Sequence, residues 1–198
     1  VKISARGAIL KASVVKQNMQ ALDDVIRSVA WSYGASQVAY MEYCGSAFQS
    51  APPARSLVHS ITDEQPFQNI VSNSSVGQAF YELEPSESSY SGLFVRGDER
   101  AIINQSASTM TQVYVATGSQ KQEMSLSYRP SATSIVTGAS NGKPLNLIRV
   151  NIISLNSSLP ETLGGKFYLK TTASDIVTTS TLYDFNQTVS SLAVKATL

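Results

Sequence analysis

The stretch AILKASVVKQNMQALDDVIRSV, at residues 8–29, carries the most regular pattern in the chain. Apolar residues recur at spacings that alternate between four and three, at Ala8, Ala12, Val15, Met19, Leu22, Ile26 and Val29. Because an α-helix completes a turn every 3.6 residues, these side chains share one face. We therefore predict a long amphipathic helix over residues 1–33, with this stripe as its packing and assembly face.

The polar residues of this segment are expected to point mostly away from the stripe: Lys11, Lys16, Gln17, Asn18, Asp23, Asp24 and Arg27. The helix should end near Ser32-Tyr33-Gly34, because glycine readily takes the left-handed conformation that follows a helix. We interpret Trp31 and Tyr33 as a wedge that packs the end of the helix onto the following domain.

Beyond Gly34 the pattern changes to alternation with a period of two, which is typical of strands. Residues 124–129 read as a half-buried strand, and residues 145–155 as a central strand because both faces are partly apolar. The predicted strands are residues 36–43, 78–83, 93–96, 101–103, 112–117, 124–129, 145–155, 167–170 and 192–198.

Turn signals separate these strands. Asn141-Gly142 strongly predicts a hairpin, and Gly118-Ser119, Arg96-Gly97-Asp98 and Gly164-Gly165 predict further turns. Residues 49–55 and 85–92 read as exposed loops. Many short strands without intervening helices favour an antiparallel β-sandwich. The expected fold is mainly β (α+β): an N-terminal helix over residues 1–33 and a β-sandwich-like domain over residues 34–198.

Composition narrows the class of function. Charged residues make up 15% of the chain, against about 25% in typical soluble domains. Ser, Thr, Asn and Gln replace them, which favours an extracellular or cell-surface location. The net charge is +1 and no basic stripe with interleaved aromatics is present, so we expect no nucleic-acid partner. The first residue is Val1, from which we expect a mature or truncated product whose membrane anchor lay upstream.

Residues for catalysis are scarce. The chain has one cysteine, Cys44, and one histidine, His59, so neither a zinc site nor a thiol nucleophile is expected. A nucleophile elbow and a phosphate-binding glycine loop are both missing from the sequence. Glu82 and Glu84 could share a strand face and bind calcium weakly, but we favour a solvated acidic edge. We predict no catalytic residues, no metal, no cofactor and no small-molecule substrate.

Four sequons offer candidate N-glycosylation sites, at Asn73, Asn104, Asn156 and Asn186. We expect each to lie at or beside a turn or a strand end. The tripeptide Arg96-Gly97-Asp98 is also used by some integrin ligands, but a turn favours Gly-Asp for backbone reasons alone.

The order of features resembles archaeal type IV pilin-like and archaellum-accessory surface proteins. The resemblance is carried by a helix followed, after a short break, by strand segments, and it covers most of the chain as a loose pattern. Its stretches are residues 18–31 (NMQALDDVIRSVAW), 36–43 (SQVAYMEY), 92–100 (GLFVRGDER), 124–131 (MSLSYRPS) and 147–158 (LIRVNIISLNSS). The resemblance implies a membrane-anchored surface protein with self-association or other pilus and envelope proteins as partners, N-glycans, and no catalytic residues.

We therefore predict a non-catalytic structural module of a surface appendage or envelope. Two other classes stay open. One is an extracellular ligand-binding or adhesion β-sandwich, which would need an exposed aromatic platform at Tyr81, Tyr90 or Phe94. The other is a secreted hydrolase that uses one of the acid clusters. A viral capsid or envelope protein also fits the composition.

Overall fold

The computed structural model describes residues 2–62, 68–83, 92–104, 109–117, 121–157, 159, 162–184 and 193–197. Helix α1 (Lys2–Val29) comes first, and the other elements of the described residues are strands. These are β1 (Ser36–Met41), β2 (Phe48–Thr62), β3 (Gln68–Leu83), β4 (Phe94–Arg96), β5 (Thr111–Thr117), β6 (Gln122–Tyr128), β7 (Ser131–Ser140), β8 (Lys143–Asn151), β9 (Thr162–Leu163), β10 (Phe167–Thr172) and β11 (Ala193–Thr197).

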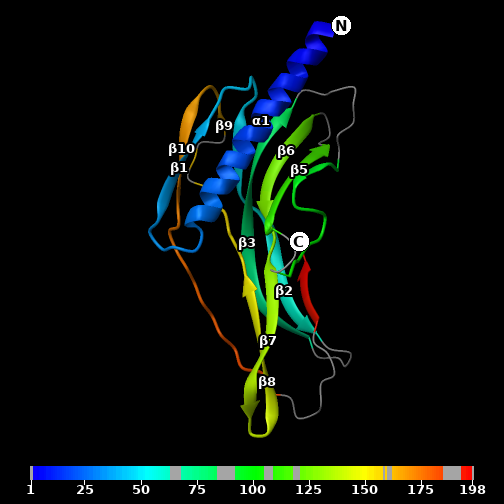
Figure 1. Ribbon diagram of the computed structural model, residues 1–198, viewed down its shortest axis with the longest axis vertical. Coiled ribbons are helices and arrows are strands. Elements are labelled where there is room, and N and C mark those ends of the chain that lie inside the picture. The colour runs from blue at the N-terminus through cyan, green and yellow to red at the C-terminus, as the bar shows by residue number, and fades with distance from the viewer. Residues whose placement is uncertain are drawn as a thin grey trace.

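The strands form one large antiparallel sheet and two separate ribbons. The order of the large sheet is β11-β2-β3-β6-β5-β4, and β9 pairs with the start of β2, on residues 48–49. One ribbon pairs β1 with β10, and the other pairs β7 with β8. Helix α1 lies across the upper half of the large sheet in Figure 1, while the β7–β8 ribbon extends from the opposite end.

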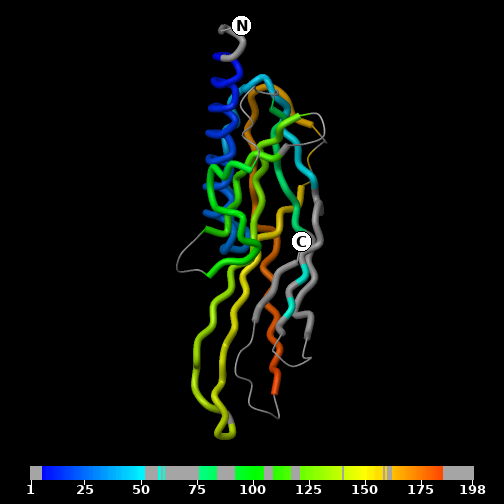
Figure 2. The backbone as a smooth tube through the Cα atoms, turned by 90° about the vertical axis from the view of Figure 1, so that its right-hand side faces the viewer, coloured from blue at the N-terminus to red at the C-terminus, as the bar shows by residue number. Residues whose placement is uncertain are grey.

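The core lies between α1 and the strands. Met19 and Leu22 of α1 pack with Tyr81 of β3 and Leu126 of β6, all of them buried. The β1–β10 ribbon closes the same core with Leu169 and its neighbours. Each large apolar side chain buried in this way contributes about 1.5–3 kcal/mol. Figure 2 shows the helix on one side of the strands. The predicted N-terminal helix and antiparallel strands are confirmed, and the sandwich stays a prediction.

The helix matches its expected stripe but differs at its end. Of the seven stripe residues, Val15, Met19, Leu22, Ile26 and Val29 are buried, and Ala8 and Ala12 are half-buried. The helix ends at Val29, four residues before the predicted boundary. Gly34 has a φ of 74°, as expected for the turn, and its N–H donates to the carbonyl of Ala173 at 2.9 Å.

Two expectations about side chains near the helix are wrong. Asn18 and Asp23, expected to point away from the stripe, are 3% and 0% exposed. Trp31 and Tyr33, expected to form a wedge, are 53% and 75% exposed. The polar pair is buried because partners on the strands satisfy both groups, as described below. The aromatic pair lies in the turn after α1 and stays outside the core.

Several strand predictions also need correction. Strand β2 runs through residues 49–55, which were expected to be a loop. Its pairing with β3 shifts between Ala51 and Arg55, so the backbone of Pro52-Pro53 lies at an irregularity where missing N–H groups do least harm. Residues 101–103 form only an isolated bridge at Ile103. Strand β6, expected to be half-buried, is buried on both faces, including Ser125.

The β7–β8 ribbon both confirms and corrects the sequence analysis. Asn141 and Gly142 have φ values of 53° and 77°, which confirms the predicted hairpin turn. The central strand predicted at 145–155 is wrong, because β8 ends at Asn151 and pairs only with β7 among the described residues. The apolar residues on both of its faces are partly or largely exposed instead. Among the described residues, no helix is long and apolar enough to cross a bilayer.

Candidate functional site

The most elaborate polar cluster joins the C-terminal part of α1 to the large sheet at Asp23. Its carboxylate accepts hydrogen bonds from the hydroxyls of Thr111 and Tyr128, both at 2.7 Å. The guanidinium of Arg96 contacts it directly, and Nε of Arg27 lies at 3.2 Å. Burial, with the nearby carboxylate, raises the pKa of Tyr128 far above its usual range. A buried carboxylate is tolerated because cations and hydroxyls surround it.

The adjacent Asp24 lies at the exposed edge of this cluster. Its carboxylate pairs with Arg96 at 2.9 Å and with Arg27 at 2.8 Å. The Arg96 hydrogen bond, opposed in part by desolvation, lowers the pKa of Asp24. Both arginines therefore bridge a buried and an exposed carboxylate, which orders the last turns of α1 against β4.

A second contact fixes the helix one and a half turns earlier. Asn18 donates from Nδ2 to the carbonyl of Glu42 at 2.8 Å and to the hydroxyl of Tyr81 at 3.2 Å, and its Oδ1 accepts from the Glu42 N–H at 3.0 Å. Burial raises the pKa of Tyr81 to about 12. Apolar burial alone does not set the register of a helix, whereas these directional bonds do. Asn18 and Asp23 together form what we call the helix clasp.

The sequence held a signal for the clasp that the stripe analysis missed. Asn18 lies four residues before Leu22, and Asp23 lies four residues after Met19. Residues four apart on a helix share a face, and a core-facing stripe in a globular protein is wider than a strict seam. Because Asn18 and Asp23 are polar, they were expected to face solvent. A buried carboxylate or amide is predicted only when its hydrogen-bond partners can be identified.

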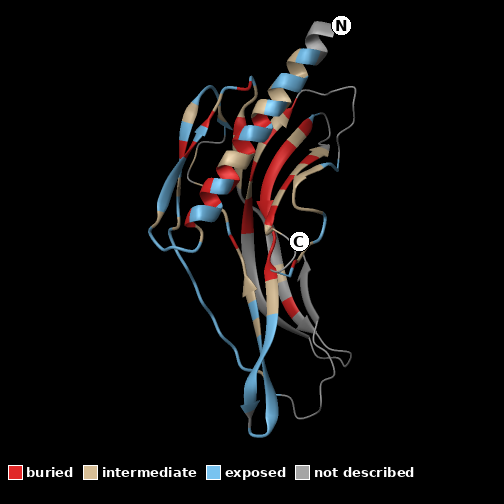
Figure 3. Ribbon diagram, in the orientation of Figure 1, coloured by how far each residue is buried: buried red, intermediate tan, exposed pale blue. Residues whose placement is uncertain are grey.

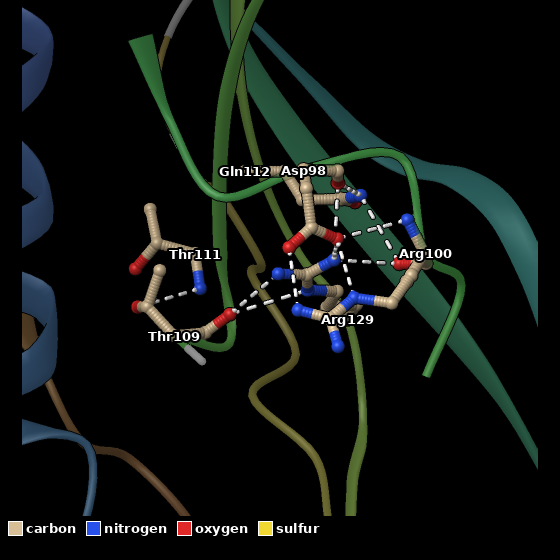
Figure 4. Close-up of polar contacts among 6 residues, drawn as sticks. All are labelled: Asp98, Arg100, Thr109, Thr111, Gln112 and Arg129. Carbon is tan, nitrogen blue, oxygen red and sulfur yellow. Dashed lines mark hydrogen bonds and ion pairs between the residues drawn. The ribbon is translucent and has the colours of Figure 1, made fainter. Parts of the chain in front are cut away.

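A further cluster surrounds Arg129, which is 2% exposed at the end of β6 (Figure 4). Its guanidinium donates to the carbonyls of Thr109 at 3.0 and 3.2 Å, Asp98 at 3.0 Å and Arg100 at 2.8 Å, and it contacts the Asp98 carboxylate. Arg100 also pairs with Asp98 at 2.7 Å. Arg100 and then Arg129 hold the pKa of Asp98 far below its usual range. The cluster joins residues that follow β4, Asp98 and Arg100, to Thr109 just before β5.

The tripeptide Arg96-Gly97-Asp98 is thus used inside the fold. Arg96 binds the helix clasp and Asp98 binds Arg129. Gly97 has a φ of 80°, and a Cβ there would lie 2.2 Å from the carbonyl of Thr111, so glycine is required for both conformation and space. Both charged side chains are engaged within the chain, which argues against display of this tripeptide to a receptor.

The four sequons fall in different settings. Asn104 and Asn156 are exposed. The backbone of Asn73 lies within β3, opposite Val58, so its expected place beside a turn is wrong. Its side chain, and Asn186 as a whole, lie outside the described residues. Two of the four asparagines are therefore exposed, and glycosylation at all four stays a prediction.

The other candidate groups, a thiol, a histidine and two carboxylates, form no catalytic or metal-binding cluster in the part of the chain that is described. Cys44 is buried, and burial raises the pKa of its thiol. Glu82 is bound by Lys121 and Gln49, while Glu84 lies outside the described residues. His59 lies in β2 and its side chain is likewise outside them. No group of three potential ligands that could hold a metal occurs among the described residues.

The aromatic platform at Tyr81, Tyr90 or Phe94 that would favour the alternative of a ligand-binding β-sandwich is not found at the positions described. Tyr81 is 1% exposed, Phe94 is half-buried against Tyr114, and Tyr90 lies outside the described residues. Exposed aromatics occur instead on the β1–β10 ribbon, where Tyr40 and Tyr168 are 42% and 76% exposed.

Comparison with other proteins adds no assignment, because no protein-family model, curated protein or solved structure matches this chain.

Proposed function

We propose that this protein is a non-catalytic structural module of a cell-surface appendage or envelope, similar to a pilin, which assembles through its N-terminal helix. Its partners in this proposal are copies of itself or other envelope proteins. The β-domain, which we propose is sandwich-like, presents the polar surface outward. The low charge of the chain and the exposed sequons at Asn104 and Asn156 support a location at the cell surface.

A single observation carries the proposal: the two ends of α1 differ in their surroundings. The C-terminal part is buried against strands, whereas the first turns extend past the end of the sheet (Figure 3). Near that projecting end Ile9 and Leu10 are 64% and 67% exposed. Large aliphatic side chains on a projecting helix gain about 1.5–3 kcal/mol each when a partner covers them.

The charges near the projecting end favour a partner that is not basic. Arg6 is exposed there and Lys16 is exposed further along α1, and the first acid of the chain is Asp23. The clasp at Asn18 and Asp23 holds the buried part in place, so the projecting end is presented at a set angle rather than on a swinging linker. A rigid projection lowers the entropic cost of association.

The proposal is tested by sedimentation velocity of the full chain over a range of concentrations. We expect reversible self-association, weakened about tenfold to a hundredfold in Ile9→Glu/Leu10→Glu because two aliphatic contacts are lost. The matched control is Leu93→Glu/Val177→Glu, which makes the same change at sites 52% and 75% exposed elsewhere.

The control should associate as the parent chain does. Equal weakening in both pairs would show that added charge alone prevents association. A parent chain that stays monomeric at every concentration, and that binds no envelope protein in the same assay, would contradict the proposal.

A further inference from the structure

The outer face of the β1–β10 ribbon carries a pair of exposed aromatic rings. Tyr40 pairs directly with Tyr168 across the two strands, and their ring centroids lie 5.2 Å apart at an interplanar angle of 46°. The opposite face of the same ribbon is buried, since Ala39 and Leu169 lie in the core. The core therefore holds the ribbon in place and leaves the two rings on the flank of the molecule (Figure 1).

One ring of the pair is fixed by a hydrogen bond. The Tyr40 hydroxyl donates to Oε2 of Glu42 at 3.0 Å, and Oε1 of Glu42 accepts from the N–H of Tyr43, also at 3.0 Å. Nζ of Lys166 lies 3.7 Å from the same carboxylate. A side chain that is already ordered loses less conformational entropy when a ligand binds, so Tyr40 is suited to hold one.

The charges around the rings give this face a cationic balance. Residues two apart on a strand share a face, so Val38 and Lys170, which pair directly, lie on one side of the rings. Glu42 and Lys166 lie on the other side and pair with each other. Lys170 is exposed and makes no ion pair with a described residue. The surplus charge on the face is thus the ammonium group of Lys170, which favours an anionic partner.

The size of the face limits what can cover it. The two strands are each six residues long. At about 3.3 Å per residue and about 4.8 Å between strands, they make a face of roughly 20 Å by 10 Å. A stable interface between two proteins buries about 800 Å² on each partner, which is several times this area. The face therefore fits a narrow linear ligand better than a second folded domain.

The number of free cations separates the kinds of anionic ligand that such a face can bind. Single-stranded nucleic acid stacks on aromatic rings, but each nucleotide carries a phosphate and its binding grooves are lined with several cations. An anionic membrane surface attracts clusters of about four to eight basic residues. A polysaccharide in which uronic acids alternate with uncharged sugars has more widely spaced charges. A single ammonium group beside two rings matches that spacing best.

We propose that the face formed by Tyr40, Tyr168 and Lys170, which we call the tyrosine platform, binds an acidic polysaccharide. Pyranose rings lie on the two tyrosines, because the negative face of an aromatic ring attracts the C–H groups of a sugar. A carboxylate of the ligand pairs with Lys170. The neighbouring Glu42–Lys166 pair offers an acceptor and a donor for sugar hydroxyls. This binding function goes beyond the proposed structural role and does not depend on the projecting end of α1.

Isothermal titration calorimetry of the full chain with hyaluronan oligosaccharides, in which glucuronate alternates with an uncharged sugar, tests the charge. We expect binding that weakens about fivefold when the carboxylates are converted to methyl esters. Lys170→Gln should weaken it by a similar factor, because an exposed ion pair is lost. The two losses should not add, since both remove the same ion pair. Lys16→Gln, at an exposed site on α1, is the matched control and should bind as the parent does.

The rings are tested in the same titration. Tyr168, 76% exposed, can be replaced with little effect on the core. Tyr168→Ala should weaken binding about tenfold, whereas Tyr168→Phe should keep the parent's affinity, because the ring and not its hydroxyl stacks on the sugar. Tyr33→Ala, at a site 75% exposed in the turn after α1, is the control and should leave binding unchanged.

Several outcomes would overturn the tyrosine platform as a polysaccharide site. One is the absence of binding both to hyaluronan and to heparosan, which has the same alternation with another linkage. Another is equal affinity in Tyr168→Ala and Tyr33→Ala. Tighter binding to oligodeoxythymidylate or to phosphatidylglycerol vesicles would assign the face to nucleic acid or to a membrane instead. Self-association that depends on Ile9 and Leu10 is measured separately in sedimentation, so failure of either proposal leaves the other standing.

Discussion

The carboxylate of Asp23 in α1 accepts a hydrogen bond from the hydroxyl of Tyr128 in β6, at 2.7 Å, across 105 residues of sequence. With Thr111 and the two arginines, this bond connects the helix to the large sheet at a point that solvent does not reach. It is the contact on which the rigid presentation of the projecting helix end depends.

Asp23→Asn removes the charge that offsets Arg96 and Arg27 while it retains the shape of the side chain. We expect a loss of about 1–3 kcal/mol in the free energy of unfolding, because the hydroxyls of Thr111 and Tyr128 lose a charged acceptor while both arginines keep their pairs with Asp24. Urea unfolding followed by circular dichroism measures it. Asp24→Asn, where the side chain is 59% exposed, should cost less than about 1 kcal/mol. Similar losses for both variants would show that Asp23 is not the central group.

The raised pKa of Tyr81 should make the free energy of unfolding fall at alkaline pH. Its pKa is about 12 in the folded protein against 10.0 ordinarily. Below pH 10 the hydroxyl is protonated in both states, so its full contribution is present; above that pH the unfolded state loses a proton first and stability falls. The loss through this group should reach about 2–3 kcal/mol as pH rises toward 12.

Urea midpoints measured between pH 8 and pH 11 check this, and the parent should lose more stability over this interval than Tyr81→Phe. Tyr33→Phe, at a site 75% exposed, serves as the control and should follow the parent. A Tyr81→Phe curve that coincides with the parent curve would contradict the assignment.

The lowered pKa of Asp98 should make the free energy of unfolding fall at acid pH. Arg100 and Arg129 hold its pKa far below the usual value, so the unfolded state takes up a proton first as pH falls through about 4. Its contribution is present above that pH and is lost below it. Asp98→Asn should therefore be less stable than the parent at neutral pH and lose less stability on acidification. The measurement is a urea midpoint series from neutral to acid pH.

The control for this series is Asp175→Asn, at an exposed position that makes no ion pair with a described residue. It should keep both the parent's stability at neutral pH and its acid dependence. An Asp98→Asn protein that loses stability on acidification as steeply as the parent would show that other carboxylates dominate.

Replacement of Ser125 or Ser127 by alanine should cost no stability. Both hydroxyls are buried and have no hydrogen-bond partner in the described structure. Ser125→Ala and Ser127→Ala should leave the free energy of unfolding unchanged or raise it by up to about 1 kcal/mol, because removal of an unsatisfied polar group removes its desolvation cost. Thr111→Val is the contrast, since its hydroxyl donates to Asp23 and its loss should cost about 1–2 kcal/mol. A clear loss in the serine variants would reveal a partner, such as a bound water.

The regular parts of the fold could be predicted because their signals are local. Val15, Met19, Leu22, Ile26 and Val29 follow the turn of a helix, and all five are buried. Phe167 and Leu169 alternate with exposed Tyr168, as their strand requires. These patterns depend on which neighbours share a face, and residues close in sequence decide that.

The errors fall where distant partners decide the outcome. Leu145 and Leu147 read as a central strand, yet β8 has β7 alone as a described partner and both side chains stay largely exposed. Apolar residues on both faces of a strand show that its burial would be favourable. They do not show whether other strands of the same chain pack against it.

The sequence by itself determined the helix stripe, the alternation of the strands and the Asn141-Gly142 turn, because helical period, strand period and positive φ are properties of short segments. Only the tertiary structure decided that Asn18 and Asp23 face inward, and that Arg96 and Asp98 of one tripeptide serve two different clusters. The physical reason is that burial of a polar group depends on its hydrogen-bond and charge partners. Here most of those partners lie tens of residues away, so the helical period can place Asn18 and Asp23 beside the core face but cannot show that partners satisfy them there.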